Sequence, residues 1–580
     1  MKNENIYRLQ KLIEVASKKR KADLIIKNAN IINVFNESSF TSDLAIYDNR
    51  IAGIGEYDDG EKVIDAKNLF VSPSFIDSHM HIESTKLIPF ELASALLPHG
   101  TSCIVCDPHE IANVCGTEGI EFLIKGSQNL PIDIFFLAPS CVPATLLETN
   151  KGVLDFKKLI KLKRYKQVLG LAEVMNYPAV IEGQNEILFK ISSFKDMIID
   201  GHAPSLTKEN LNAYISSGIY SDHECTTKEE ALEKLSKGMY IMIRQGSVTK
   251  DLINLVPIIN DKTKNRILLC TDDKDPDDII NLGHINHSIK LLIENGVPIP
   301  LAIKLASLNP SIFFGFKQRG AIAPGYFADL VIFEDICSIK YVIKNGKIVF
   351  DHGVKNFSND SSYIPSNISK KITNSMNFRK FNLEELKVKN KGKKIRVISI
   401  KNDSIITEEK IFAPKVHEGF VISDTSNDII KVVVVERHMR SGNICVGFIN
   451  GFGLKKGAFA STIAHDSHNI IAIGENDEDL YNSINHLKNI NGGIAISYNG
   501  KIVADLPLIY AGLMSDMHVH EVASRYNNLK KVAKEVCETI LEDPFMTLSF
   551  MTLPVIPDIK ITDKGIVNVN KFSFVDLFVD

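Results

Sequence analysis

The feature that most constrains how this 580-residue chain folds is a regular alternation of apolar, β-branched runs with segments of helical periodicity. Such alternation is typical of βαβ units, in which helices connect parallel strands. The eight strand-like runs are Leu69–Asp77, Thr101–Cys106, Ile132–Leu137, Val168–Leu171, Met197–Ile199, Gly218–Tyr220, Met239–Ile243 and Ile267–Cys270. Eight units within about 250 residues match a (β/α)₈ barrel, so we predict an α/β protein built on such a barrel.

The segments on either side of the barrel predict smaller domains. Residues 22–70 read as alternating strands, and Ile26–Ile31 is echoed by Ile343–Ile348, so both flanks are expected to contribute strands to one small β domain. Strand-like runs and a helical segment after residue 395 predict an α+β domain. The predicted division is 1–70 for an N-terminal helix and small β domain, completed by about 321–360; 71–320 for the barrel; 361–395 for a polar linker; and 396–580 for the C-terminal domain.

Composition limits the partners of the chain. Lys and Arg total 67 against 70 Asp and Glu, so the net charge of −3 gives no basic surface for nucleic acid. The N-terminus is charged throughout, and no run reaches the ~18 apolar residues of a membrane span. The nine cysteines lie in apolar runs without the spacing of a disulfide framework. We therefore expect a cytoplasmic protein with reduced thiols, and with neither nucleic acid nor membrane as a partner.

Side chains suited to metal binding follow several of the predicted strands, at the end of the barrel where active sites form. These are His79, His81, Glu173, His202, His223 and Asp272. His79 and His81 are two residues apart in an extended segment, so both imidazoles point to the same face and can reach one ion. Four imidazoles and two carboxylates suffice for two divalent ions with a bridging carboxylate. Such a site would hold a hydroxide between the metals, because it lowers the pKa of bound water to roughly 7.

Two polar segments of the C-terminal region have open interpretations. The histidine-rich turn His465–Asn469 could bind metal, complete a neighbouring site or form a hydrogen-bonded loop. The segment Glu436–Arg440 is either a charged loop or a source of substrate contacts. The sequence does not decide whether this domain closes over the barrel.

Several short motifs point to one family. The segment Phe75–Ser84, with the sequence FIDSHMHIES, resembles the opening of the amidohydrolase superfamily. Together with it, the motifs DPHEI at 107–111, GHAP at 201–204, SDHE at 221–224, CTDD at 270–273 and HDSHN at 465–469 are similar to the bacterial adenine deaminase family. The resemblance covers nearly the whole chain. It implies hydrolysis of adenine to hypoxanthine and ammonia in purine salvage, a binuclear site with Mn²⁺ or Fe²⁺, and a homodimer.

The resemblance also implies roles for individual residues. His79 and His81 would bind one metal together with Asp272, His202 and His223 would bind the other, and Glu173 would bridge them. Ligand chemistry alone does not choose between Mn²⁺ or Fe²⁺ and Zn²⁺. Asp272 is also the expected general base, and Glu224 is the candidate for protonating the purine ring, with Glu83 or Glu110 as replacements. The purine is expected to contact four further residues: Asp107, His109, Glu110 and Arg244.

Three positions depart from the family pattern, and two other functions remain open. Ser74 stands where a glycine is usual, Thr85 replaces a serine, and Gln245 replaces a glutamate, which removes a charge beside the site. A cyclic amide or N-acyl hydrolase would use the same hydroxide on the same scaffold, although no lysine is available on strand four to bridge the metals as in some of those enzymes. A non-catalytic assembly protein that has lost its metals is the third reading.

Overall fold

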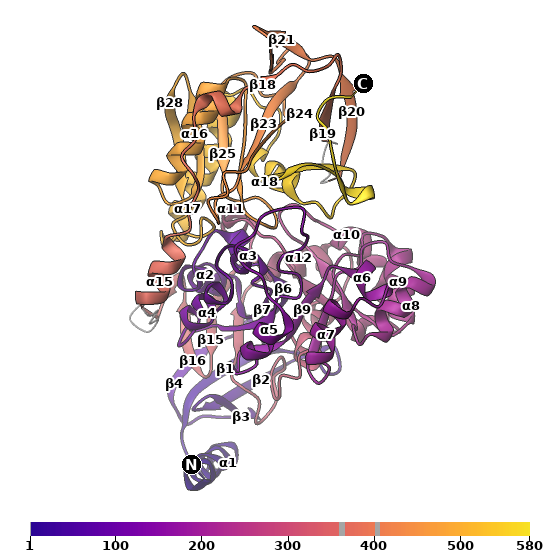
Figure 1. The fold of residues 1–580 in the computed structure, drawn as a ribbon. Coiled ribbons are helices and arrows are strands. Elements are labelled where there is room, and N and C mark those ends of the chain that lie inside the picture. Colours follow the sequence, from indigo (N-terminus) through magenta and orange to yellow (C-terminus); the bar gives the residue numbers. More distant parts are fainter. Residues whose placement is uncertain (1, 359–365, 401–405, 580) are drawn as a thin grey trace.

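Eight parallel strands form the centre of the computed structural model, which describes residues 2–358, 366–400 and 406–579 (Figure 1). They are β6 (Phe75–Met80), β7 (Thr101–Cys106), β8 (Asp133–Ala138), β9 (Val168–Val174), β10 (Ile198–Gly201), β11 (Ser221–Asp222), β12 (Tyr240–Arg244) and β13 (Ile267–Cys270). Strands β6 to β10 pair in sequence order, as do β11 to β13. A parallel bridge between Met80 and Asp272 joins the last strand to the first. The strands therefore close into the predicted barrel.

Alternation along each strand explains how the barrel is packed. In β7, Ile104 faces the core shared with the outer helices, whereas the next residue, Val105, faces the barrel interior. The interior is filled by small and branched side chains from the other strands, among them Leu137, Ala172, Met242, Leu268 and Cys270. Outer helices include α2 (Pro89–Leu96), α4 (Thr117–Gly126), α5 (Phe156–Leu162), α7 (Asn185–Ser193), α8 (Lys208–Ser216), α9 (Lys228–Ser236) and α12 (Ile285–Glu294). A filled interior leaves the strand ends as the place for a site.

The first and sixth barrel strands differ from the prediction. The run Leu69–Asp77 is two strands, because β5 (Phe70–Pro73) pairs with β1 (Ala22–Asn33) and β14 (Leu330–Phe333) in another sheet and only β6 belongs to the barrel. The change of sheet falls at Pro73, which has no N–H to continue a ladder. The sixth strand is Ser221–Asp222 rather than Gly218–Tyr220. Its register places Asp222 and His223 at the strand end.

A second sheet combines segments from both flanks of the barrel. Its order is β17-β16-β15-β14-β5-β1-β2-β3, with β4 paired to β1. The strands before the barrel are β1 (Ala22–Asn33), β2 (Ser38–Tyr47), β3 (Arg50–Gly55) and β4 (Gly60–Asp65), and those after it are β14 (Leu330–Phe333), β15 (Ile339–Lys344), β16 (Lys347–Asp351) and β17 (Val354–Lys355). With helix α1 (Lys2–Ala16), this sheet lies at the opposite end of the molecule from the C-terminal domain (Figure 1).

The C-terminal domain is built on an eight-stranded sheet with the order β20-β19-β24-β23-β26-β25-β27-β28. Its central strand β23 (Ile429–Val435) is buried on both faces. On one face, Val433 and Val435 pack with helix α16 (Asp477–Asn489). On the other face, Val432 and Val434 belong to the large core that contains α17 (Val519–Glu535) and part of the barrel. The other strands are β19 (Ile395–Ile400), β20 (Thr407–Phe412), β24 (Ile444–Asn450), β25 (Ala458–Ser461), β26 (Ile470–Gly474), β27 (Gly493–Tyr498) and β28 (Lys501–Pro507).

The segment predicted to be a polar linker is packed where the structure describes it. Helix α15 (Ser366–Thr373) contributes Ile372 to the main core, and Phe378 and Phe381 are buried beneath helix α16. These apolar side chains are spaced too irregularly to stand out in a polar sequence. All nine cysteines are free, as predicted. No described helix is long and apolar enough to cross a membrane.

Candidate active site

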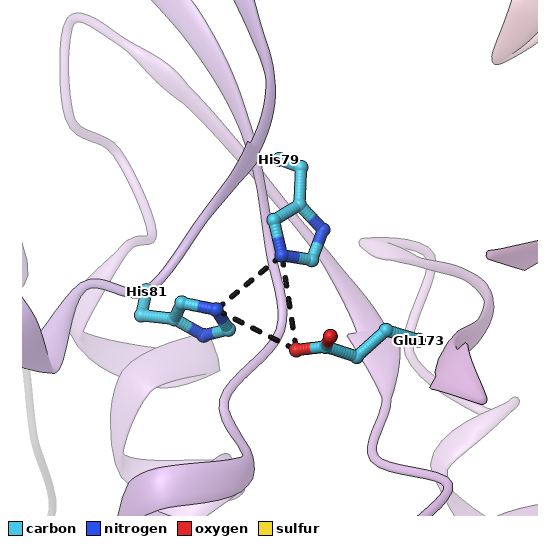
Figure 2. Close-up of side chains that lie close together, drawn as sticks. All are labelled: His79, His81 and Glu173. Atoms are coloured by element: carbon cyan, nitrogen blue, oxygen red, sulfur yellow. Dashed lines mark hydrogen bonds and ion pairs between the residues drawn. The ribbon is translucent and has the colours of Figure 1, made fainter. Parts of the chain in front are cut away.

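The two histidines at the end of β6 direct ring nitrogens toward each other and toward Glu173 (Figure 2). His79 Nδ1 donates to Asp200 Oδ2 at 2.9 Å, and His81 Nδ1 donates to the carbonyl oxygen of Asp107 at 3.1 Å. These partners leave the lone pair of each ring on Nε2. The two Nε2 atoms are 3.3 Å apart and fully buried. Two lone pairs at that distance repel each other unless a cation lies between them, so the pair has the donor chemistry of a metal site.

Glu173 at the end of β9 connects two histidine pairs. Its Oε1 lies 3.8 Å from His79 Nε2 and 3.5 Å from His81 Nε2 (Figure 2). Its Oε2 lies 2.7 Å from His202 Nδ1 and 3.3 Å from His223 Nε2. The two oxygens of this carboxylate therefore face two different histidine pairs. A carboxylate that bridges two metal ions requires this arrangement.

Asp272 adds a second carboxylate from the end of β13. Its Oδ1 lies 3.2 Å from His81 Nε2 and 3.8 Å from His79 Nε2. The backbone of Asp272 has a φ of 61°, a left-handed conformation that is uncommon for a residue with a side chain. Hydrogen bonds to His79 O and from His81 N hold this conformation. The strand end is thus fixed with its carboxylate turned toward the histidines.

Arg244 holds the outer side of the cluster. Its Nη1 donates to Glu224 and, at 3.2 Å, to Asp272 Oδ2, while its Nε donates to Asp251 Oδ2 at 3.0 Å. The guanidinium is buried, and a buried charge is costly unless it is paired. Arg244 meets this requirement through its three acidic partners. Arg244 was predicted to contact the purine, and that contact stays a prediction; the structure shows its bonds to Asp272 and Glu224.

The electrostatics of the cluster favour positive charge. Burial alone would lower the pKa of His202 and His223, but neighbouring carboxylates, Glu224 and Glu173 for the first and Glu173 for the second, raise each pKa to about 9. Burial would raise the pKa of Glu173, yet hydrogen bonds from the same two histidines hold it well below its usual range. Divalent cations supply the charge that such a set of donors attracts.

The residues after β7 extend the site toward the C-terminal domain. His109 Nδ1 lies 3.6 Å from Glu173 Oε1 and 3.3 Å from Asp107 Oδ2. Glu110 faces the C-terminal turn, with Oε1 3.6 Å from His465 Nδ1 and Oε2 3.8 Å from His468 Nε2. Burial, together with the nearby carboxylates Glu83 and Asp273, raises the pKa of Glu110 well above its usual value. Two domains therefore meet beside this cluster of candidate metal ligands.

Comparison with known proteins places the chain in a family. Residues 70–349 match the amidohydrolase family model, and residues 404–573 match that of the adenine deaminase C-terminal domain. Similar curated proteins are adenine deaminase 2 of Carboxydothermus hydrogenoformans, 44% identical over 98% of this chain and 99% of that protein, and adenine deaminase of Thermosipho africanus, 44% identical over 99% and 100%. The chain belongs to the adenine deaminase family. Among solved structures, a beta-aspartyl dipeptidase of Fervidobacterium islandicum AW-1 is similar, with 19% identity, a TM-score of 0.46, and coverage of 58% of this chain and 99% of that one.

Membership of the adenine deaminase family confirms the family predicted from the sequence, and with it a metal-dependent hydrolase barrel. The chain is therefore a hydrolase of this family.

Gln245, one of the departures noted in the sequence, is buried beside Arg244, and its Oε1 has no hydrogen-bond partner among the described residues. An amide at this position leaves Arg244 to be neutralised by Asp251, Glu224 and Asp272 alone.

Sequence reasoning assigned no role to two buried carboxylates that lie close in sequence to the histidines of this deaminase-family site. Asp200 accepts from His79, and Asp222 accepts the backbone N–H of Ala203 at 2.7 Å and a hydrogen bond from Lys234 at 2.9 Å. Both aspartates are fully buried. A signal was present, since each is an acidic residue that follows a predicted strand, within two residues of a histidine.

Proposed function

We propose that this chain catalyses the hydrolytic deamination of free adenine to hypoxanthine and ammonia. The observation that carries the proposal is the convergence of His79, His81, His202, His223, Glu173 and Asp272 at the barrel mouth of a chain in the adenine deaminase family. A purine base is also what the relatives' names specify. We further propose a role in purine salvage and a homodimeric assembly, which size-exclusion chromatography with light scattering would test.

The donor set fits two divalent ions, Mn²⁺ or Fe²⁺, with Zn²⁺ as the alternative. His79, His81 and Asp272 would hold one ion, His202 and His223 the other, and Glu173 would contribute one oxygen to each. When bound, such ions supply Lewis acidity that brings water to a pKa of roughly 7. We also propose the domain division 1–70 with about 321–360, 71–320, 361–395 and 396–580, which limited proteolysis would test.

The protein's own residues move the protons of the reaction. Asp272 accepts a proton from the attacking water while the water oxygen forms a bond to C6 of adenine. At the same time Glu224 donates a proton to the ring nitrogen N1. Asp272 then passes its proton to the amino group, which leaves as ammonia, and the hydroxyl proton on C6 restores Glu224. The products are hypoxanthine, protonated at N1, and ammonia. Arg244 acts as a positioning residue, because it binds both Asp272 and Glu224.

Turnover of adenine by the protein purified with added Mn²⁺ tests this function. Ammonia release and the ultraviolet change from adenine to hypoxanthine are followed, with adenosine and a hydantoin as comparison substrates. The variants His79→Ala and Asp272→Asn should abolish turnover, whereas His352→Ala, at an exposed position of the flanking sheet, should not. No turnover by a protein holding about two metals would exclude adenine and favour the amide hydrolase. A protein that binds no metal after reconstitution would favour the non-catalytic reading.

A further inference from the structure

The turn His465–Asn469 of the C-terminal domain lies against the barrel and is completely buried. Its backbone and flanking side chains are held from several sides. The buried guanidinium of Arg437 donates to His468 O, His438 Nε2 donates to Ser467 O at 2.7 Å, and Asn469 Nδ2 donates to Thr149 O at 3.0 Å. Thr149 belongs to the loop that follows barrel strand β8. The turn is therefore rigid and fixed to the barrel mouth, as a preorganised binding element must be.

Two side-chain atoms of this rigid turn nevertheless lack partners among the described residues. Asp466 Oδ2 and His468 Nε2 are buried, and neither has a hydrogen-bond partner among the described residues. Both face barrel residues beyond hydrogen-bond distance: Asp466 Oδ1 is 3.9 Å from His109 Nε2, and His468 Nε2 is 3.8 Å from Glu110 Oε2. Buried groups left unpaired are costly, so a structure that fixes them so firmly implies a ligand that pairs with them.

The tautomer of His468 indicates the kind of ligand. Its Nδ1 accepts the backbone N–H of Ala464 at 3.2 Å, so the neutral ring carries its proton on Nε2. Burial and the neighbouring cations lower the pKa of His468 well below its usual value, which agrees with a neutral ring. An Nε2–H group donates a hydrogen bond and has no lone pair for a metal. The turn therefore offers one acceptor, the Asp466 carboxylate, and one donor, His468 Nε2–H.

The position of this pair relative to the metal-binding cluster indicates which part of a substrate it meets. His109 lies between the two regions, with Nδ1 3.6 Å from Glu173 Oε1 and Nε2 3.9 Å from Asp466 Oδ1. The imidazole ring of His109 thus separates Asp466 from Glu173. A purine whose C6 faces the cluster directs its five-membered ring away from it. That ring presents one N–H donor and one unprotonated nitrogen as an acceptor, the complement of Asp466 and His468.

We propose that Asp466 and His468 bind the imidazole edge of the purine, and that Asp466 selects the free base over N9-substituted purines by accepting the ring N–H. The proposal rests on the proposed deaminase function. It assigns the C-terminal domain a direct part in substrate recognition: a substituent on N9 removes the proton that Asp466 accepts and places bulk against a buried, rigid turn. The nucleoside is rejected by the same contact that binds the base.

Inhibition by 9-methyladenine, compared with turnover of adenine, tests the proposal in the metal-loaded enzyme. The Asp466→Ala variant should lose about 10- to 100-fold in kcat/KM for adenine, the usual effect of removing a hydrogen bond to a charged group. Its inhibition constant for 9-methyladenine should change less than about threefold, so that discrimination between the two bases falls at least about threefold. A structural role for Asp466 would weaken both ligands equally. Metal content should stay at the wild-type value.

Further variants separate the possible outcomes. Asp516→Asn, at an exposed site of the same domain, should leave both constants unchanged. If Asp466→Ala does not fold, Asp466→Asn should shift discrimination in the same direction by a smaller factor, and His468→Gln should raise KM for adenine more than it lowers kcat. Unchanged discrimination in the Asp466 variants of an active enzyme would overturn the inference. An inactive wild-type enzyme with two bound metals would instead overturn the proposed function.

Discussion

The barrel and the C-terminal domain each bury histidines at the same junction, but in opposite electrostatic environments. In the barrel, His81, His109, His202 and His223 lie beside carboxylates that raise their pKa values against the effect of burial. In the C-terminal domain, burial and cations lower the pKa values of His438, His465 and His468. The barrel histidines therefore attract positive charge, whereas those of the C-terminal domain stay neutral.

The partner of the second ring nitrogen explains this difference at the atomic level. In His79 and His81 the Nδ1–H group donates to an acceptor, which leaves a lone pair on Nε2 for a metal. In His468 the Nδ1 accepts a backbone N–H, which leaves a proton on Nε2 for a ligand. Two histidine clusters that look alike in sequence are thus suited to different ligands, a metal in one case and an organic base in the other.

The largest effect is expected from removing the carboxylate that joins the two barrel pairs. Glu173→Gln keeps the size of the side chain but loses the charge that balances His202 and His223. We expect deaminase activity to fall at least about 10³-fold, a loss of about 4 kcal/mol in transition-state stabilisation. Metal content should fall below that of the wild type, as measured by plasma mass spectrometry.

The matched control for this variant is Glu186→Gln on helix α7, where the side chain is 84% exposed. It should keep wild-type activity and metal content. A fully active Glu173→Gln enzyme with its metals in place would show that the site does not need a carboxylate between the two histidine pairs.

A smaller effect is expected from the carboxylate behind His79. Asp200 Oδ2 accepts His79 Nδ1–H, and its Oδ1 accepts the hydroxyl of Ser221. Asp200→Asn keeps the shape but weakens the control of the tautomer, so metal affinity or activity should fall about 10- to 100-fold. Competition with a chelator measures the affinity, and excess Mn²⁺ should restore part of the activity. An unchanged affinity would mean that Asp200 does not set the orientation of His79.

Much of the barrel and of its candidate site could be predicted from the sequence, because barrel strands and their ends follow local patterns. The spacing of His79 and His81 and the position of Glu173 after a buried run were enough to predict that these side chains lie together at one mouth of the barrel. The first strand was predicted as a single run because its apolar character continues through Pro73, where the chain changes sheets. Local composition does not record which sheet a strand joins.

The roles of individual ring nitrogens depend on residues distant in the chain. His79 meets Asp200 across 121 positions, and His465 and His468 meet Glu110 only because the C-terminal domain packs on the barrel. The sequence therefore left the turn His465–Asn469 open between a metal site, a completed neighbouring site and a loop. Similarly, the sequence did not reveal the three carboxylate partners of Arg244, which lie up to 28 positions away.

The smallest of these effects is a dependence of stability on pH that arises in the C-terminal domain. Burial, with Arg437 nearby, holds the pKa of His438 well below the usual value of 6.5. The unfolded chain takes up a proton on this residue below about pH 6.5, whereas the folded chain does not. The free energy of unfolding therefore falls as the pH decreases from 6.5, by up to about 1.4 kcal/mol per pH unit for each such histidine.

His438→Gln isolates this contribution, because glutamine still donates to Ser467 O but does not titrate. Denaturant unfolding at pH 7, 6 and 5, in chelator to remove metal linkage, should show a slope against pH that is lower by up to about 1.4 kcal/mol per unit in the variant. The barrel histidines do not produce the same slope, since groups with raised pKa values are protonated in both states below pH 6.5. Parallel curves for variant and wild type would mean that His438 takes up its proton in the folded protein, and the contrast between the two histidine environments would then not extend to this residue.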